Sequence, residues 1–309
     1  MSYANSFFGT PEFAATSLHT LIANGKNVVA VVTSCDQLGG RGGKNLIESP
    51  VKKMAEAHHI RILQPKSLKN KEFIEQLMSL KADIYIIVAF RMLPEVVWTI
   101  PPLGSYNLHG SLLPKYRGAA PIHWAIINGE KETGVTVFKL KHEIDTGDIL
   151  MKVSMPIFEN DTTGSVHDRM MVLGAGVLLE AMDKIQNNAQ FMIQDEKEVT
   201  HAPKIFHDDC KINFFQSTNK VYDFIRGMSP HPGAWVKIDG IECKILSATF
   251  LLNKETKPGH IDTDGKKYMN IETKDGKIQI ETIKMAGKKL MSIQEFLSGY
   301  RLQQSFIGD

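Results

Sequence analysis

An amide and an imidazole lie two residues apart at Asn107 and His109, at the end of a predicted short strand. Side chains alternate between the two faces of an extended strand, so we expect both groups to point the same way and to reach one small group. The stretch that follows, residues 110–122, is rich in Gly, Pro and Ala and has neither helical nor strand periodicity. We therefore predict a loop of fixed shape, the kind of element that often carries functional residues.

A carboxylate completes this set at Asp145, in the turn formed by residues 145–148. A carboxylate beside an imidazole raises the basicity of the ring and fixes its orientation. The three groups together predict acyl-type transfer, because the amide can donate to a carbonyl oxygen as that oxygen gains negative charge. The imidazole can also donate or can move protons, with the carboxylate supporting the imidazolium. The pattern contains no obvious nucleophile of the protein's own.

Apolar runs and helical patterns alternate in the first half of the chain and must position these groups. Residues 28–32 and 84–89 read as strands buried on both faces, and residues 14–22 and 73–78 as helices between them. This order predicts a doubly wound, mostly parallel sheet of α/β class, which binds ligands beyond the carboxyl ends of its strands. At the turn formed by residues 9–11 we expect Thr10 to cap a helix that begins at Pro11.

Further elements follow the same reasoning. Residues 121–127 and 163–185 are predicted helices, and residues 135–140 form a predicted strand that leads to the Asp145 turn. After a linker without clear period, a helix over 218–227 precedes short alternating strands separated by Asp-Gly turns at residues 239, 264 and 275. Ser292 and Glu295 form a capping box for a last helix. We predict a catalytic domain over residues 1–189, a linker over 190–206 and a small β-barrel domain over 207–309.

The composition bounds the function more loosely. The chain has 309 residues, of which 43% are hydrophobic and 23% charged, as in ordinary soluble proteins of two domains. Its net charge is only +2, so binding to nucleic acid would need a local basic surface. The three cysteines are far apart and lack CxxC spacing, and no apolar run is long enough to span a bilayer. We expect reduced thiols in a cytoplasmic protein.

Two groups of cations could supply such a surface. Arg41 and Lys44 lie in a stretch with four glycines in ten residues, and Lys284, Lys288 and Lys289 flank a turn that Arg226 could join. Phosphates attract clusters of this kind. The alternative interpretation, a solvated loop and a solvated face, is at least as well supported by composition alone.

The most specific feature of the sequence is the run SLLPKYRGAAPI over residues 111–122. Together with Asn107, His109, the DTG of residues 145–147 and the GTPEFA of residues 9–14, it resembles the folate-dependent formyltransferases. Within them it is most similar to the branch that formylates methionyl-tRNA. The resemblance covers nearly the whole chain and implies a Rossmann-like catalytic domain followed by an OB-like barrel.

The resemblance also implies ligands and residue roles. The formyl donor would be 10-formyltetrahydrofolate, bound as co-substrate without a metal, and the acceptor would be the amino group of initiator methionyl-tRNA. Catalysis would fall to Asn107, His109 and Asp145. The residues implied in folate binding are Val88, Ala89, Phe90, Leu93, Ser111, Leu112, Leu113, Pro114 and Asp145. Those implied or suggested to contact tRNA are Arg41, Lys44, Arg226, Lys284, Lys288 and Lys289. We expect a monomer that does not bind membranes.

Three other functions compete with this one. A sugar-nucleotide formyltransferase would share the catalytic motifs, but the glycine-rich cationic loop and the full AAPI ending favour tRNA. A hydrolase that releases formate would use the same three residues with water as acceptor, yet would have little use for the second domain. A non-catalytic nucleic-acid-binding protein would not need the intact set of Asn107, His109 and Asp145.

Overall fold

The computed structural model describes residues 3–39, 45–187, 190–253 and 255–307. By its internal contacts the chain forms two compact units, and neither is a single continuous stretch. The first comprises Met1–Gly118, Gly134–Met155 and Asp168–His201. The second comprises Ala119–Thr133, Pro156–His167 and Ala202–Asp309. The predicted limits at residues 189 and 206 stay a prediction, because this division follows contacts and not a single cut.

A seven-stranded sheet forms the framework of the first unit, in the order β10-β9-β7-β6-β1-β2-β5. Its strands are β1 (Asn5–Gly9), β2 (Val28–Val32), β5 (Arg61–Leu63), β6 (Ile84–Val88), β7 (Ser105–His109), β9 (Glu132–Lys139) and β10 (Ile149–Pro156). The pairs from β5 to β7 are parallel, whereas β9 runs antiparallel to β7. Phe7, Phe8 and Tyr85 are completely buried, as expected for strands covered on both faces.

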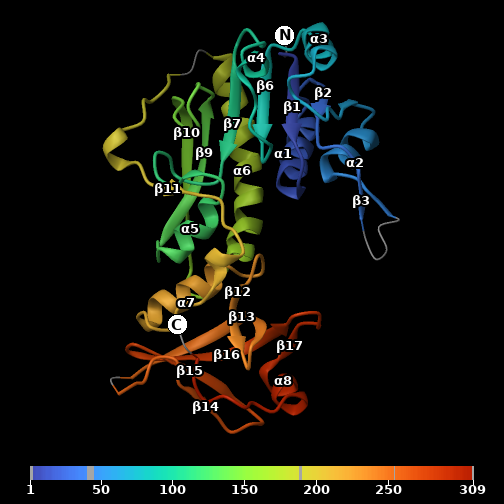
Figure 1. Cartoon of the computed structure of the whole chain (residues 1–309). Helices are drawn as coiled ribbons and strands as arrows, with labels where there is room; N and C mark the ends of the chain where they lie inside the picture. The colour runs from blue at the N-terminus through green and yellow to red at the C-terminus, as the bar shows by residue number, and fades with distance from the viewer. Residues whose placement is uncertain (1–2, 40–44, 188–189, 254, 308–309) are drawn as a thin grey trace. The chain divides into compact units, whose positions relative to one another are not determined.

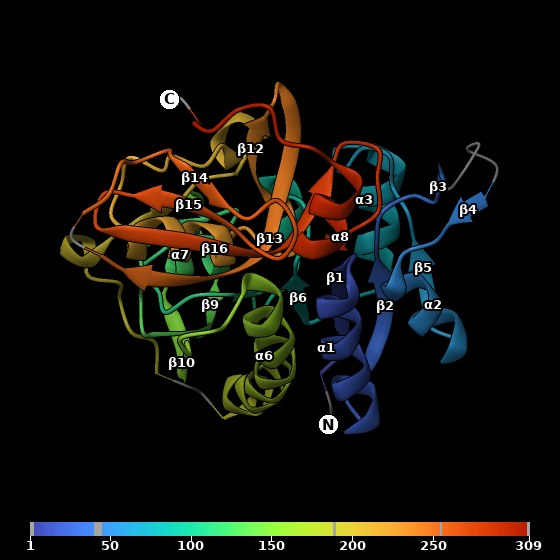
Figure 2. The ribbon, with the colours of Figure 1, turned by 90° about the horizontal axis from the view of Figure 1, so that it is seen from below.

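Helices cover this sheet. They are α1 (Glu12–Ala23), α2 (Pro50–Ala57), α3 (Lys71–Ser79), α4 (Glu95–Trp98) and the long α6 (Thr163–Gln186). Figures 1 and 2 show α1 and α6 side by side along the sheet. A Cβ on Gly174 of α6 would lie 3.1 Å from Leu108 on β7 and 3.5 Å from Phe13 on α1. The glycine therefore lets α6 pack closely on both elements.

The strand order reverses direction between β1 and β6. From β1 the chain builds outward through β2 and β5 on one side, then returns to place β6 and β7 on the other. Gly9, Val88 and Leu108 lie in register across β1, β6 and β7. In a doubly wound sheet, this reversal opens a crevice beyond the carboxyl ends of the strands, where ligands bind. His109 is the last residue of β7 and therefore lies at this edge.

Two local predictions were wrong by one residue. Helix α1 begins at Glu12, with Pro11 in the extended conformation of an N-cap, and no side chain caps it. The Pro11 carbonyl accepts from the Ala14 and Ala15 N–H groups. Strand β6 ends at Val88, because Ala89 has a φ of +46°, which no regular strand accommodates.

The second unit contains two helices and an antiparallel sheet. Helix α5 (Pro121–Ile127) packs on α7 (Thr218–Gly227), where a Cβ on Gly227 would lie 2.6 Å from Ile127. The sheet has the order β12-β13-β16-β15-β14, with β17 paired to β16. Its strands are β12 (Ala234–Ile238), β13 (Ile241–Leu252), β14 (Ile261–Thr263), β15 (Met269–Thr273), β16 (Gly276–Met285) and β17 (Met291–Ser292). Each of the predicted Asp-Gly turns connects two of these strands.

The fold class is confirmed: a mostly parallel α/β sheet is followed by an antiparallel β domain. The capping box is also confirmed, because Ser292 and Glu295 bond each other's backbone N–H at the start of α8 (Ile293–Gly299). Trp235, Ile245, Ile278 and Phe296 belong to the buried core of this second unit. Among the described residues, no helix is both long and apolar enough to cross a lipid bilayer.

The capping box gives a direct test of local stability. Ser292→Ala removes the hydroxyl that accepts from the Glu295 N–H at 3.2 Å, and loss of such a cap costs about 1 kcal/mol. We expect urea unfolding to show a lower free energy of unfolding on this scale. Ser298→Ala, at an exposed position on the same helix, is the matched control, because its hydroxyl bonds the Gln294 carbonyl, which the helix can satisfy otherwise. Equal losses in the two variants would contradict the capping role.

Candidate active site

Asn107 and His109 lie on the same face of β7, as the alternation of side chains predicts. His109 is buried, with 7% of its surface exposed, whereas Asn107 is half-buried. Within the described part of the chain, the Asn107 side-chain amide forms no hydrogen bond. A polar amide left open at the carboxyl edge of a parallel sheet is suited to bind a ligand.

The His109 ring is held in one tautomer by the loop that follows it. Its Nε2 lies 2.9 Å from the backbone carbonyl oxygen of Tyr116. A carbonyl oxygen can only accept, so Nε2 carries the hydrogen and donates. The other ring nitrogen, Nδ1, is therefore the atom that can gain or lose a proton. It faces Asp145, whose Oδ2 is 3.9 Å away.

Asp145 is fixed from the same loop. Its Oδ2 accepts a hydrogen bond of 2.8 Å from the Gly118 N–H, and its side chain is only 11% exposed. Asp145 and Tyr116 both adopt positive φ angles, of +56° and +61°. This conformation is uncommon for residues other than glycine and concentrates at functional sites. The structure thus brings Asn107, His109 and Asp145 to one place, as predicted, although their catalytic roles stay a prediction.

The first part of the loop is shaped by internal hydrogen bonds. The Ser111 hydroxyl donates to the Lys115 carbonyl at 2.6 Å, and the Thr136 hydroxyl bridges the Ser111 carbonyl and the Leu113 N–H. Leu113 is completely buried against Phe138 and Ile149. Ser111, Leu113 and Pro114 are therefore buried parts of the loop, and only Leu112 of the predicted folate-binding run is half-buried. Their contact with folate stays a prediction.

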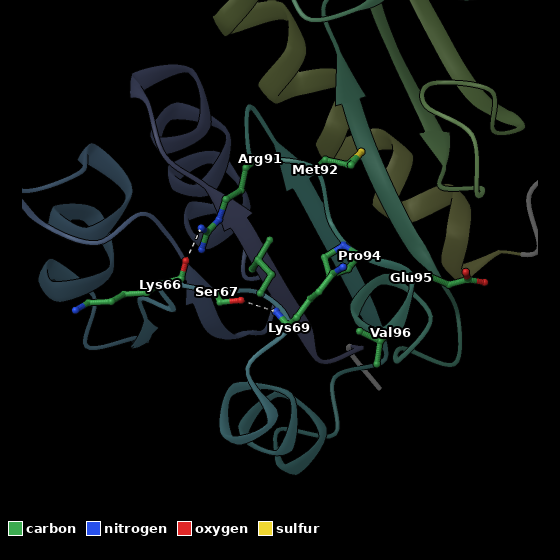
Figure 3. A pocket seen from close by; sticks show the side chains of 9 residues that line it. Lys66, Ser67, Lys69, Arg91, Met92, Pro94, Glu95 and Val96 are labelled. Atoms are coloured by element: carbon green, nitrogen blue, oxygen red, sulfur yellow. Dashed lines mark hydrogen bonds between the residues drawn. The ribbon is translucent and has the colours of Figure 1, made fainter.

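Residues 89–94 connect β6 to α4 and follow the carboxyl end of the strand beside β7. Val88 and Leu93 are buried, Phe90 meets Phe8 edge to face at 5.8 Å, and Ala89 is exposed. The neighbouring residues line a cavity of about 650 Å³ (Figure 3). Its lining consists of Lys66, Ser67, Leu68, Lys69, Arg91, Met92, Pro94, Glu95 and Val96. The cavity thus combines apolar walls with three cations and one carboxylate.

A buried polar network lies behind the Asp145 turn, and sequence reasoning missed it. Arg117 is 7% exposed and Gln194 is 6% exposed, and they bond each other from segments far apart in the chain. The Arg117 and Tyr116 N–H groups donate to the Thr200 carbonyl and hydroxyl, both at 2.9 Å. The sequence predicts only a linker over residues 190–206. Polar residues without periodicity give no signal for pairing over some eighty positions.

The two strands that flank the glycine-rich stretch with Arg41 and Lys44 pair as a hairpin, and this hairpin is anchored at its base. Its strands are β3 (Gln37–Gly39) and β4 (Asn45–Ile47), and Arg41 and Lys44 lie outside the described residues. Lys52 on α2 bonds Asp36, which precedes β3, at 2.5 Å and Glu48, which follows β4, at 2.6 Å. Hydrogen bonds from Lys52 and Gln64 hold the pKa of Asp36 below its usual value. One ammonium group therefore ties together the two ends of the hairpin.

The predicted cations of the second unit do not form one group. Lys284, Lys288 and Lys289 are exposed on β16 and the turn after it. Arg226 is only 4% exposed, and its guanidinium bonds the Asp223 carboxylate and the Asp161 carbonyl. Including Arg226 in a surface patch was therefore wrong, because its donors are used inside the unit. Among residues 3–39, 45–187, 190–253 and 255–307, no cluster of His, Cys, Asp and Glu is arranged to hold a metal.

Comparison with known proteins assigns the family. A family model described as formyl transferase matches residues 1–182, and a model of the formyl transferase C-terminal domain matches residues 204–301. A protein named methionyl-tRNA formyltransferase from Bacteroides fragilis is 45% identical over 97% of this chain and 96% of its own length. One of the same name from Phocaeicola vulgatus is 48% identical over 96% and 95%.

A solved structure agrees on the fold. WlaRD, described as a sugar 3N-formyl transferase in the presence of dTDP and 5-N-formyl-THF, superimposes with a TM-score of 0.68. That comparison covers 94% of this chain and 100% of WlaRD at 22% identity, which establishes similarity of fold alone. The matches to both family models and the extent of identity to the two relatives establish the family. The chain belongs to the methionyl-tRNA formyltransferases of the formyl transferase family.

Proposed function

We propose that this protein transfers the formyl group of 10-formyltetrahydrofolate to the amino group of methionine on initiator methionyl-tRNA, for translation initiation. The observation that carries the proposal is the convergence of an open amide, a single-tautomer imidazole and a fixed carboxylate at Asn107, His109 and Asp145. The proposal is also supported by the name shared by two relatives that match nearly the whole chain at 45% and 48% identity.

The chemistry of the cavity fits a folate. Reduced folates combine a flat heterocycle and an aryl ring with a glutamate tail that carries two carboxylates. Leu68, Met92, Pro94 and Val96 supply apolar walls, and Lys66, Lys69 and Arg91 supply cations for the carboxylates. Arg91, Met92 and Pro94 of the lining lie in the same segment, residues 88–94, as the folate-binding residues implied by the resemblance, although none of those predicted residues lines the cavity itself. The folate, when bound, supplies the one-carbon group in activated form.

The three site residues divide the work of the transfer. The Asn107 amide donates to the formyl oxygen as negative charge develops there. The neutral His109 ring presents the lone pair of Nδ1, because Nε2–H is already bonded to the Tyr116 carbonyl. Nδ1 can therefore take the proton that the attacking amine loses, and Asp145 stabilises the resulting imidazolium. The imidazolium can then return this proton to the folate nitrogen that departs when its bond to the formyl carbon breaks. Held in this geometry, the reacting groups avoid much of the entropic cost of meeting in solution.

A large anionic acceptor accounts for features that a small one would leave unused. Lys284 lies directly opposite Lys244 in the pairing of β13 with β16, where like charges destabilise a sheet, and the Lys244 ammonium donates to the Pro232 carbonyl. Lys288 and Lys289 add exposed charge close to it. These residues, with Arg41 and Lys44 of the hairpin, are our candidates for phosphate contacts.

The choice of acceptor tests the proposal against a sugar-nucleotide formyltransferase, which would use the same donor. We expect the protein, supplied with 10-formyltetrahydrofolate, to formylate charged initiator tRNA far faster than charged elongator tRNA or an amino-sugar nucleotide. Formylated product is measured for each acceptor at matched donor saturation. Preferential formylation of the sugar nucleotide would replace the proposed function with its competitor.

Substitutions of the three residues test their roles. Asn107→Ala should lower kcat about a hundredfold to a thousandfold, the usual cost of losing a donor to a developing oxyanion. His109→Ala should cost at least as much, because it also removes the proton acceptor. His58→Ala, an exposed histidine on the same unit, is the control and should keep full activity. A loss below about fivefold for Asn107→Ala in the folded protein would remove it from the mechanism.

The hairpin cations are tested through salt. Arg41→Ala should weaken the use of tRNA, raising the KM for tRNA while leaving that for folate unchanged. It should also flatten the dependence of the tRNA KM on salt by roughly one phosphate contact. Lys53→Ala, an exposed lysine on α2, serves as the control. Superimposable salt series for wild type and Arg41→Ala would mean that Arg41 lies in a solvated loop.

A further inference from the structure

Gln194 is a buried amide whose hydrogen-bonding groups are all engaged around the Asp145 turn. Its Nε2 donates to the carbonyl oxygens of Asp145 and Gly147, both at 2.8 Å. Its Oε1 accepts from the Arg117 guanidinium, from Nε at 3.1 Å and from Nη2 at 2.8 Å. The reverse orientation would set an oxygen against two carbonyl oxygens and an NH₂ against a cation. The partners therefore fix which way the amide points.

This amide joins the two pieces of chain that hold the site carboxylate. On one side is the turn at Asp145, whose φ of +56° needs support from its surroundings. On the other is Arg117, the residue before Gly118, whose N–H bonds the Asp145 carboxylate. Gln194 thus holds the backbone carbonyl of Asp145, while Gly118, the residue after Arg117, holds the Asp145 side chain. Removing the amide would leave the buried Gly147 carbonyl oxygen and the partly buried Asp145 carbonyl oxygen without these donors.

The turn at residues 145–148 is also restrained by its packing against β9. A Cβ on Gly147 would lie 1.6 Å from the Lys139 carbonyl oxygen, so the turn is already pressed against β9. Glu196 also bonds the Arg117 guanidinium, at 2.8 and 3.1 Å, and that bond lowers the pKa of Glu196. Glu196 is 72% exposed, however, and exposed ion pairs contribute little rigidity. The buried amide is the firmer of the two contacts to Arg117.

We propose that Gln194 is a positioning residue for the reaction: by holding the Asp145 and Gly147 carbonyls, it keeps the Asp145 carboxylate facing Nδ1 of His109. The inference rests on the proposed function for its kinetic consequence only. A displacement of about 1 Å at a reacting group can cost up to about a hundredfold in rate. Loss of the amide should therefore lower kcat about tenfold to a hundredfold with the KM for folate and for tRNA little changed.

Two variants separate the contacts that Gln194 makes. Gln194→Met keeps the length of the side chain but removes both the donor and the acceptor. Gln194→Glu keeps an acceptor for Arg117 but presents no donor to the two carbonyls. Both variants should therefore lose activity if the carbonyl contacts position Asp145. Gln294→Met, an exposed glutamine on α8, is the matched control and should behave as wild type.

The decisive measurement is independent of activity. The NMR signals of the His109 ring, assigned with His109→Ala, are recorded at one pH for wild type, both Gln194 variants and Asp145→Asn, with circular dichroism confirming the fold. We expect the Gln194 variants to move these signals toward their positions in Asp145→Asn. Unmoved ring signals in folded variants, or wild-type behaviour of Gln194→Glu, would overturn the proposal. A wild type that formylates no tRNA would refute the proposed function, while the ring signals would still report on the role of Gln194.

Discussion

The hydrogen bond from the His109 ring to the Tyr116 carbonyl sets the chemistry that the site can perform. It assigns the hydrogen to Nε2 and leaves Nδ1 as the nitrogen that exchanges protons. The tautomer depends on the position of the Tyr116 carbonyl oxygen. Tyr116 itself lies in a strained conformation with a positive φ angle. The remainder of the loop, bonded to Thr136, Thr200 and Asp145, is what makes this conformation persist.

Backbone N–H and carbonyl groups therefore fix the positions of the functional side chains in this site. The Gly118 N–H holds a carboxylate, the Tyr116 carbonyl fixes a tautomer, and two carbonyls of the 145–147 turn are held by one amide. Such contacts carry little constraint on residue type at the backbone end. The parallel sheet supplies the fixed reference, because the carboxyl end of β7 puts His109 at the ligand-binding edge of the sheet, beside β6 and one strand away from the reversal between β1 and β6.

Short-range patterns in the sequence predicted the alternating elements, the common face of Asn107 and His109, and the capping box, because each depends on neighbours within a few positions. The alternation that aligned Asn107 with His109 is one example. The sequence could not reveal the roles of Gln194 and Thr200. Both lie in a stretch without periodicity, and their hydrogen-bond partners lie far away along the chain. Arg226 was misjudged for a related reason: its charge suggested the surface, whereas Asp223 and a distant carbonyl hold it inside.

The interleaving of the two units limits what can be cut from this protein. The chain passes between them after residues 118, 133, 155, 167 and 201, so the second unit is not simply its C-terminal part. An expressed fragment that stopped at residue 201 would retain α5 but lose α7, exposing the apolar surface that Ile127 and its neighbours bury. It would also keep the Asp161 carbonyl without the Arg226 guanidinium that bonds it. A soluble catalytic core would therefore need a redesigned surface over residues 119–133 and 156–167, and not merely a stop codon.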